Sequence, residues 1–392
     1  MKKKIAIINQ RYGLEVNGGS ELYSRQIAER LVKKYDVEVL TTCALDYTTW
    51  RNHYKVGIDK INGVNVRRFP VEHERDQSIF SALNAEMLHS PNASPEKADE
   101  WIDAMGPYTP QLIEYLKEHK DAYDVFIVVT YLYYTAVRSM PIVADKAIFI
   151  PTAHQEPYIH FKMYDAIFKM PKTYIFLTEE EKLLVQNQFD IRDKLCDVMG
   201  VGVDVPYNAS EFEFKKKYRI DNYLIYVGRI DLGKDCPRLF NYFMKYKQRN
   251  PSNLKLVLMG KAEIDIPKHP DIINLGFVSD MDKFNGIKGA KALMLPSKFE
   301  SLSISVLEAM AESVPVIVNG DCEVLKGHCM KSNGGLYYGN FLEFESAINY
   351  LLNNSDIHQS MSQNAKRYID EHYRWDNIME RFDQMIEIMY NG

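Results

Sequence analysis

The sequence predicts an α/β protein made of two doubly wound domains, and three observations support this fold class. The chain has 392 residues, more than a single hydrophobic core usually organises. Short apolar runs alternate with amphipathic stretches in two successive series, as in parallel sheets covered by helices. Turn-forming residues cluster between the series at residues 206–213. We therefore expect one domain over residues 1–205, a second over residues 206–372, and a terminal helical segment over residues 373–392.

The first series opens with an apolar strand and a polar loop that ends in Gly18 and Gly19, and a helical period follows over residues 21–35. A longer polar stretch with helical periodicity covers residues 76–120. The run Val125–Val129 is apolar throughout, which is typical of the buried centre of a parallel sheet. The strands expected in this domain are residues 4–9, 37–41, 63–69, Val125–Val129, 147–151, 173–177 and 195–203.

The second series begins with an apolar strand at Tyr223–Val227. Further strands, each separated by a helix, are expected at residues 254–259, 272–275, 292–295 and 315–318. The last segment, residues 375–390, carries apolar residues at helical spacing. This spacing predicts a helix that closes the second domain or crosses back onto the first.

Composition describes a soluble globular protein and excludes several classes of function. Hydrophobic residues make up 46% of the chain, charged residues make up 26%, and the formal net charge is −5. Proteins that bind nucleic acid are usually basic, so no nucleic-acid partner is expected. The five cysteines are scattered and never spaced C-x-x-C, so neither a zinc site nor a disulfide framework is indicated. We expect them to be buried thiols of a reducing compartment.

The N-terminus is basic, but the apolar run after its three lysines is too short for a signal peptide and is better interpreted as the first strand. No apolar run reaches the length of a membrane-spanning helix. We expect a cytoplasmic protein, with peripheral attachment to the inner face of the cell membrane as a further option.

Residues 296–311 form the most informative stretch of the chain. They place Glu300 and Glu308 around a serine-rich turn that leads into a helix, between two apolar strands. A helix N-terminus favours an anion, so we expect a phosphate here. A hydrolytic pair of carboxylates is disfavoured, because the interval spans about 12 Å along a helix and glycosidase carboxylates lie about 5–9.5 Å apart. The alternatives are an acid that complements the helix dipole for Glu300 and an exposed carboxylate for Glu308.

Two cations, Arg229 and Lys234, follow the first strand of the second domain, where open α/β sheets bind ligands. A forked guanidinium and a point charge suit a diphosphate, and the alternative is a pair of solvated surface cations. In the first domain, Gly18 and Gly19 do not complete a G-x-G-x-x-G motif; they let a ligand approach the backbone or only shape a turn. His154 follows another strand and could orient a sugar or serve an acceptor, with a structural role as the alternative.

Together these segments resemble the retaining glycosyltransferases of family four, which have the GT-B fold, over nearly the whole chain. The most specific element runs from Glu300 to Glu308 and is similar to the E-x7-E motif of that family. The other matching parts are Gly228-Arg229 with Lys234, the Gly18-Gly19 loop, His154 and residues 373–376. The resemblance implies two Rossmann-like domains that face each other across a cleft. Residues 1–205 would bind the acceptor, residues 206–372 the nucleotide sugar, and residues 373–392 would cross back to the first domain.

The resemblance also implies roles for individual residues. Arg229 and Lys234 would hold the donor diphosphate, Glu300 would contact the hydroxyls of the transferred sugar, and Glu308 would bind those of the ribose. The catalytic residues would be Glu300, Arg229, Lys234 and His154. The implied donor-binding set is Gly18, Gly19, Arg229, Lys234, Val278, Lys283, Ser303, Ile304, Ser305 and Glu308, with Val278 and Lys283 next to the base.

The implied reaction transfers a hexose, with retention, from a UDP-, GDP- or dTDP-linked sugar to a hydroxyl of a glycan or lipid-linked glycan, in cell-surface polysaccharide biosynthesis. Two cations take the place of a metal, so neither a metal nor a cofactor is implied. The chain departs from the family's E-G-F-G-[LI] pattern at Ser301 and Ser303, which puts the shape of the loop and the identity of the donor sugar in doubt. The alternatives are a GT-B-type epimerase, a sugar phosphorylase and a non-catalytic partner subunit.

Overall fold

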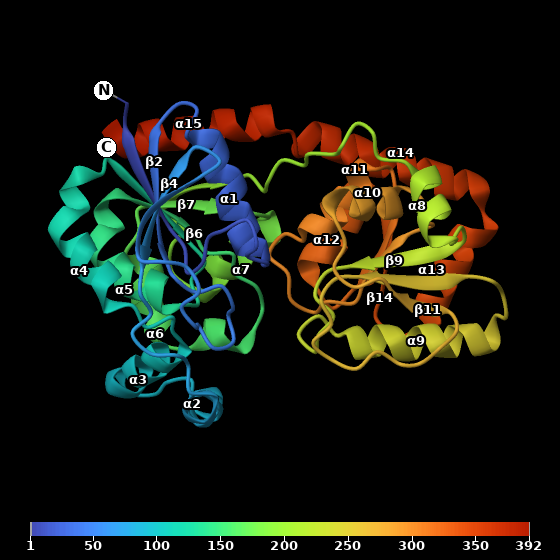
Figure 1. The fold of residues 1–392 in the computed structure, drawn as a ribbon, viewed down its shortest axis with the longest axis horizontal. Helices are drawn as coiled ribbons and strands as arrows, with labels where there is room; N and C mark the ends of the chain where they lie inside the picture. The colour runs from blue at the N-terminus through green and yellow to red at the C-terminus, as the bar shows by residue number, and fades with distance from the viewer. Residues whose placement is uncertain (1, 392) are drawn as a thin grey trace. The chain divides into compact units, whose positions relative to one another are not determined.

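The computed structural model describes residues 2–391, which form two compact units (Figure 1). The first unit contains residues 2–200 together with residues 376–391, and the second is Val201–Trp375. Each unit has its own mainly parallel sheet with helices in the connections. The predicted fold class of two doubly wound α/β domains is therefore confirmed.

The sheet of the first unit has the strand order β3-β4-β2-β1-β5-β6-β7-β8. All neighbouring strands pair in parallel except β3 and β4, which are antiparallel. The strands are β1 (Lys4–Ile8), β2 (Asp36–Thr42), β3 (Gly57–Ile61), β4 (Val64–Phe69), β5 (Val125–Val129), β6 (Ala147–Ile150), β7 (Thr173–Phe176) and β8 (Leu195–Val198).

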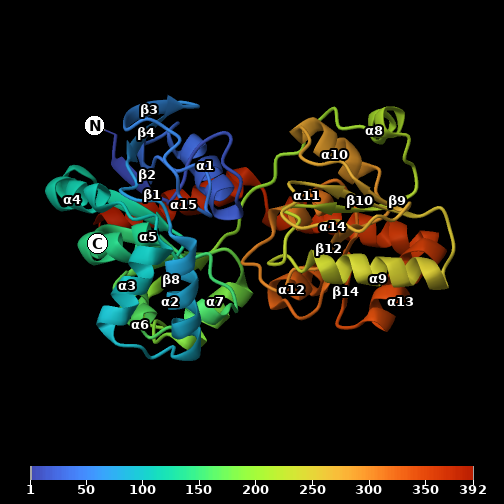
Figure 2. The same ribbon diagram turned by 60° about the horizontal axis from the view of Figure 1, so that its bottom comes forward.

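Helices cover both faces of this sheet. Side chains of α5 share a hydrophobic core with Ile8 and Phe126 on one face, and α1 lies along the other (Figures 1 and 2). The helices are α1 (Gly19–Leu31), α2 (Gln77–His89), α3 (Pro95–Met105), α4 (Pro110–His119), α5 (Tyr134–Val143), α6 (Met163–Lys169), α7 (Glu179–Gln188) and α15 (Trp375–Asn391). Three short 3₁₀ turns lie at Lys120–Ala122, Ala144–Lys146 and Pro157–His160.

The last helix, α15, packs onto the first unit through ion pairs as well as its apolar face. Lys34 Nζ lies 2.8 Å from Asp383 Oδ2, Arg381 Nε donates to Asp197 Oδ2 at 3.0 Å, and Lys3 pairs with Glu387. On its apolar face, Ile378, Phe382, Met385 and Ile386 are buried. The chain thus returns to its first unit after the second is complete.

The sheet of the second unit is entirely parallel, in the order β11-β10-β9-β12-β13-β14. Its strands are β9 (Tyr223–Val227), β10 (Lys255–Met259), β11 (Ile272–Asn274), β12 (Leu293–Leu295), β13 (Val316–Asn319) and β14 (Gly335–Tyr338). Its helices are α8 (Glu211–Tyr218), α9 (Cys236–Arg249), α10 (Asp280–Lys288), α11 (Ile304–Ala311), α12 (Glu323–Ser332), α13 (Phe341–Asn353) and α14 (Ser355–His372).

The structure adds two edge strands that the sequence did not indicate, β3 and β14. Four of the five residues of β3 are exposed, so it lacks the apolar run of a central strand. β14 begins with a glycine and is only partly buried. The expected linker at 206–213 is also too long, because α8 already begins at Glu211.

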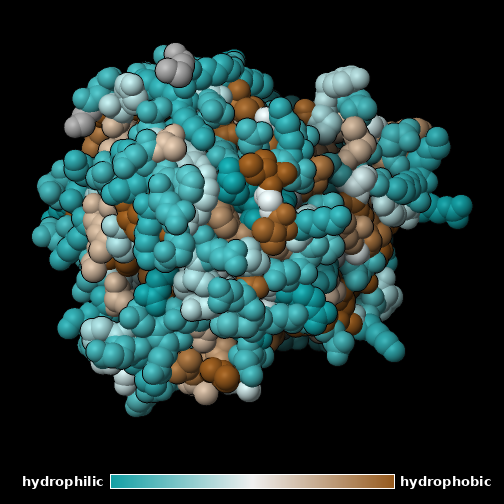
Figure 3. Space-filling model, turned by 60° about the vertical axis from the view of Figure 1, so that its left-hand side comes forward, coloured by the Kyte–Doolittle hydropathy of each residue, from teal (hydrophilic) through white to brown (hydrophobic). Residues whose placement is uncertain are grey.

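Three expectations from composition concern membrane-spanning helices, the surface and the cysteines. No helix within residues 2–391 is long and apolar enough to cross a membrane. The face in Figure 3 is mostly hydrophilic, with hydrophobic residues in small groups. The five cysteines are free thiols; Cys196 is half-buried and the other four are buried.

Candidate active site

The carboxyl ends of β9, β10 and β11 meet at one edge of the second sheet. Gly228 N, after β9, donates to Met259 O at 3.0 Å, and Gly260 N, after β10, donates to Gly276 O at 2.8 Å. Gly260 has φ +147°, and a Cβ atom there would lie 1.8 Å from Gly228 O. Only glycine fits this approach of two backbones. The backbone of the loop that carries the predicted cations is thus held by its contacts with the end of β10.

Arg229 and Lys234 are held in this loop by a residue that the sequence reasoning missed. Asp231 is largely buried; its Oδ1 accepts from Lys234 N at 2.7 Å, and its Oδ2 lies 3.4 Å from Arg229 Nη1. Aspartate side chains commonly accept a backbone N–H two or three residues later in turns and helix caps. An aspartate in the loop directly after the strand, three residues before Lys234, was therefore the signal available in the sequence. The carboxylate fixes the backbone of one cation and the side chain of the other.

Each predicted glutamate pairs with a lysine. Lys234 Nζ lies 2.6 Å from Glu300 Oε1, and Lys283 Nζ on α10 lies 2.7 Å from Glu308 Oε1 on α11. Both carboxylate side chains are 11% exposed. Four residues from three distant parts of the chain are therefore brought together in two charge-assisted hydrogen bonds, which are short and strong.

The Lys283–Glu308 pair is enclosed, and burial affects its protonation. Burial raises the pKa of Glu308, and the charge of Lys283 only partly opposes this. Burial lowers the pKa of Lys283, but attraction to Glu308 and Asp280 together outweighs it and the net pKa is raised. The alternative reading of Glu308 as an exposed helix carboxylate is wrong, because the residue is only 9% exposed.

The loop between the two glutamates keeps a backbone shape that glycine normally provides. Ser303 has φ 70° and ψ 83°, in the left-handed region, although it is not glycine. It stands at the N-cap of α11, and among the described residues its side chain makes no capping hydrogen bond. Ile304 and Ser305 form the first turn of α11, where N–H groups lack helical partners. Val278, beyond β11, is half-buried.

The remaining predicted residues lie in the first unit. Gly18 has φ +154°, and a Cβ atom there would come 2.1 Å from Glu21 Oε2. The buried Glu21 carboxylate accepts from Arg11 Nε at 2.9 Å and from Gln10 Nε2 at 2.9 Å. Gly18 therefore makes room for this network, which supports a turn-shaping role. Gly19 begins α1 and has open space around its Cα.

His154 follows β6 in a loop fixed by two carboxylates that sequence reasoning also missed. Its Nδ1 lies 3.6 Å from Glu156 Oε1, which accepts from Tyr131 Oη at 2.6 Å. The buried Glu181 accepts from Ala153 N and Leu177 N, both at 2.6 Å. Burial raises the pKa of Glu181 to about 8, while the two backbone hydrogen bonds oppose the rise.

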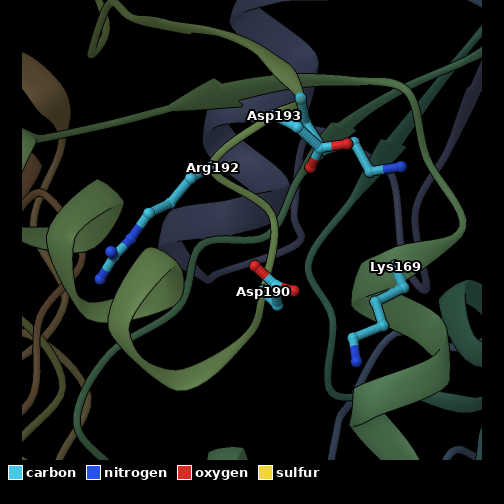
Figure 4. A pocket seen from close by; sticks show the side chains of 5 residues that line it. Lys169, Asp190, Arg192 and Asp193 are labelled. Carbon is cyan, nitrogen blue, oxygen red and sulfur yellow. The ribbon is translucent and has the colours of Figure 1, made fainter.

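A separate hollow of about 510 Å³ lies on the first unit and contains none of the predicted residues. Its lining, shown in Figure 4, consists of Lys169, Asp190, Arg192, Asp193 and Lys194. The charges of its three cations and two carboxylates largely cancel. Among the described residues, no group of three or more His, Cys, Asp or Glu side chains is arranged to hold a metal ion.

Comparison with known proteins gives one family match and several relatives. Residues 209–368 match the family described as glycosyl transferases group 1. An uncharacterized glycosyltransferase of Methanocaldococcus jannaschii is 22% identical over 416 residues, covering 96% of this chain and 95% of the relative.

Solved structures share the fold over the full length. Sucrose-phosphate synthase from Thermosynechococcus elongatus is 14% identical, with a TM-score of 0.71 and 100% of both chains covered. HepE from Anabaena, solved with UDP and glucose, is 13% identical, with a TM-score of 0.70 and coverage of 98% of this chain and 99% of HepE. At these identities the likeness shows the fold, which is GT-B.

Proposed function

We propose that this protein, which the family match and the relatives support as a group 1 glycosyltransferase, moves a sugar from a nucleotide-diphosphate sugar to a hydroxyl of a glycan or glycolipid acceptor, with retention. The observation that carries the proposal is the pair of lysine–glutamate contacts, at 2.6 and 2.7 Å, beside the carboxyl ends of the second sheet. In open α/β sheets, ligands bind at this edge. The cations suit a diphosphate, and the carboxylates suit sugar hydroxyls.

The Lys234–Glu300 pair exchanges its internal contact for contacts with the donor. Arg229 and Lys234 bind the diphosphate, and the backbone N–H groups of Ser303, Ile304 and Ser305 add donors at the helix N-terminus. When Lys234 turns to phosphate, Glu300 is released to accept hydrogen bonds from the transferred sugar.

The second pair serves the nucleoside. Glu308 accepts from the ribose hydroxyls while Lys283 keeps its charge neutralised, and Val278 lies beside the base. UDP in the HepE structure makes a uridine donor the first to test, ahead of GDP- and dTDP-sugars.

The chemistry follows from where charge develops. The bond between the anomeric carbon and the phosphate oxygen breaks, and its electron pair stays on the phosphate. The acceptor hydroxyl oxygen bonds to the same carbon on the same face, and its proton passes to the departing phosphate. Arg229, Lys234 and the α11 N-terminus stabilise the leaving group, as preorganised donors do. These cations do the work that a metal would do elsewhere, and no cofactor takes part.

The acceptor belongs to the first unit. His154, whose Nδ1 lies 3.6 Å from Glu156 Oε1, contacts the sugar or the attacking hydroxyl. Gly19, which has open space around its Cα, lets the donor approach the start of α1, and Gly18 shapes the turn before it. We place the reaction in cell-surface polysaccharide biosynthesis in the cytoplasm, with the enzyme peripheral on the inner face of the membrane when the acceptor is lipid-linked.

The test is a panel of UDP-, GDP- and dTDP-sugars. The true donor is expected to raise the melting temperature, since a ligand that binds the folded state stabilises it. Donor turnover with an acceptor glycan, followed by NMR of the new linkage, then checks retention. A panel that neither shifts the melting temperature nor supports transfer would refute the proposal, and inversion at the anomeric carbon would refute the mechanism.

A further inference from the structure

A buried chain of hydrogen bonds runs through the second unit to the loop between the two glutamates. His328, on α12, is fully buried. Its Nε2 lies 2.7 Å from Leu302 O, and its Nδ1 lies 3.1 Å from Tyr368 Oη. Tyr368 Oη in turn lies 3.2 Å from Tyr373 Oη. These residues come from the loop between Glu300 and Glu308, from α12, and from the end of α14.

The donors and acceptors in this chain can be assigned. A carbonyl oxygen only accepts, so Nε2 of His328 must carry the hydrogen that it donates to Leu302. In a neutral imidazole Nδ1 then accepts, and the Tyr368 hydroxyl donates to it. The Tyr368 oxygen is left to accept from Tyr373. The chain thus has one direction, from Tyr373 to the carbonyl of Leu302.

The carbonyl that His328 holds belongs to the peptide that joins Leu302 to Ser303. Ser303 has φ 70°, a conformation that costs free energy for any residue other than glycine. Such a conformation persists only where the surroundings over-determine it. The hydrogen bond from His328 fixes this peptide plane and with it the direction of the first N–H groups of α11.

Tyr373, at the other end of the hydrogen-bond chain, lies where the first and last segments of the second unit meet. Val203 N donates to Tyr373 O at 3.1 Å. A Cβ atom on Gly202 would lie 2.4 Å from the Trp375 ring, so the two segments are in close contact. The hydrogen-bond chain therefore runs from the loop between Glu300 and Glu308 to the first and last segments of the second unit.

We propose that His328 is a positioning residue: through Leu302 it aims the backbone N–H groups of Ser303–Ser305 at the terminal phosphate of the donor. This rests on the proposed function and assigns to a buried side chain the role that glycine fills in the pattern E-G-F-G. Because these N–H groups serve the terminal phosphate, loss of His328 weakens binding of a nucleoside diphosphate and spares the monophosphate.

The experiment compares His328→Leu, His328→Gln and Tyr368→Phe with the wild-type chain. Leucine fills the space without a donor, glutamine returns an N–H toward Leu302, and phenylalanine removes the donor to Nδ1. Tyr338→Phe is the matched control, because it removes another buried tyrosine hydroxyl of the second unit, one without a hydrogen-bond partner among the described residues. Calorimetry measures affinity for UDP, GDP and dTDP and for their monophosphates, and the melting temperature reports folding.

For the diphosphate that binds best, His328→Leu is expected to lose about tenfold in affinity with the monophosphate unchanged, the effect of one misplaced donor set. His328→Gln should recover most of the loss, Tyr368→Phe should show a smaller loss of the same kind, and Tyr338→Phe should show none. If His328→Leu fails to fold, His328→Gln and Tyr368→Phe carry the comparison.

Wild-type affinity for the diphosphate in His328→Leu and Tyr368→Phe, or equal losses for diphosphate and monophosphate, would overturn the positioning role. A wild-type protein that binds none of the diphosphates would overturn the proposed function, and this inference with it.

Discussion

Replacing Lys234 with methionine is expected to weaken binding of the preferred nucleoside diphosphate about thirtyfold, and the magnitude follows from its contact with Glu300. The two side chains lie 2.6 Å apart and are 25% and 11% exposed. Hydrogen bonds to charged groups of this kind contribute about 1.5–3 kcal/mol. If the diphosphate takes over such a bond from Glu300, its loss costs about 2 kcal/mol, which is about thirtyfold in affinity.

Replacing Glu300, the residue that pairs with Lys234, gives a second test of the same contact. In the free protein Glu300 competes with the diphosphate for Lys234, so Glu300→Gln is expected to tighten diphosphate binding by a few-fold while transfer from the nucleotide sugar falls. In Lys234→Met the unpaired Glu300 carboxylate also repels the diphosphate. The double variant should therefore lose less than Lys234→Met alone, and its departure from the sum of the two single variants gives the coupling between the two sites.

Isothermal titration calorimetry on the four proteins of this cycle measures the coupling directly. Lys366→Met is the control, because Lys366 pairs with Asp370 on α14 and is expected to leave affinity within about twofold of wild type, as exposed pairs contribute little. Diphosphate binding that is unchanged in Lys234→Met, or weaker in Glu300→Gln, would refute the exchange of partners.

Three further outcomes follow from other contacts. Glu308→Ala is expected to weaken nucleotide binding about tenfold, the loss of one charged hydrogen bond, and to remove the preference for ribose over 2′-deoxyribose; calorimetry showing equal affinity would exclude the ribose role. Burial raises the pKa of Glu181 to about 8, so the free energy of unfolding should fall by about 3 kcal/mol between about pH 5.5 and pH 8, as the unfolded carboxyl ionises first. Chemical unfolding at both pH values should show this fall in the wild type and not in Glu181→Gln; parallel pH dependences would contradict it. Arg381→Ala should speed hydrogen exchange in α15 by about two- to fivefold, because its ion pair with Asp197 is partly exposed; unchanged exchange would show that the pair does not hold the helix.

The fold was readable from the sequence where burial imposes a continuous apolar run. Val125–Val129 is fully buried, and the run predicted it directly. β3 gave no such signal because its side chains face solvent and only its pairing with β4 makes it a strand. The length of the linker was overestimated because turn residues at 206–210 continue without a break into α8.

In the candidate site, too, the sequence indicated individual residues but not the contacts between them. Local patterns drew attention to Lys234, Glu300 and Glu308, and the family resemblance added Lys283. Their pairing joins residues 66 and 25 positions apart and could not be read from spacing. The roles of the four residues stay predictions. The loss of both glycines put the loop shape in doubt, whereas the structure keeps a left-handed residue at Ser303.

Buried polar residues were the hardest to find. Asp231, Glu181 and His328 look like ordinary surface residues in the sequence, and only packing shows that they hold backbone groups. A buried acid or histidine becomes informative when its partners are known, because burial without partners would be costly. Those partners come from other strands and helices, which a local pattern does not contain.

Hydrogen exchange of the wild-type protein with and without its preferred nucleoside diphosphate tests the central claim most directly. The claim places the donor at the carboxyl edge of the second sheet, so bound diphosphate should slow exchange in residues 228–235 and in the first turn of α11, with Lys234→Met abolishing the effect at the same ligand concentration. Protection confined to other segments, or equal protection in Lys234→Met, would contradict it.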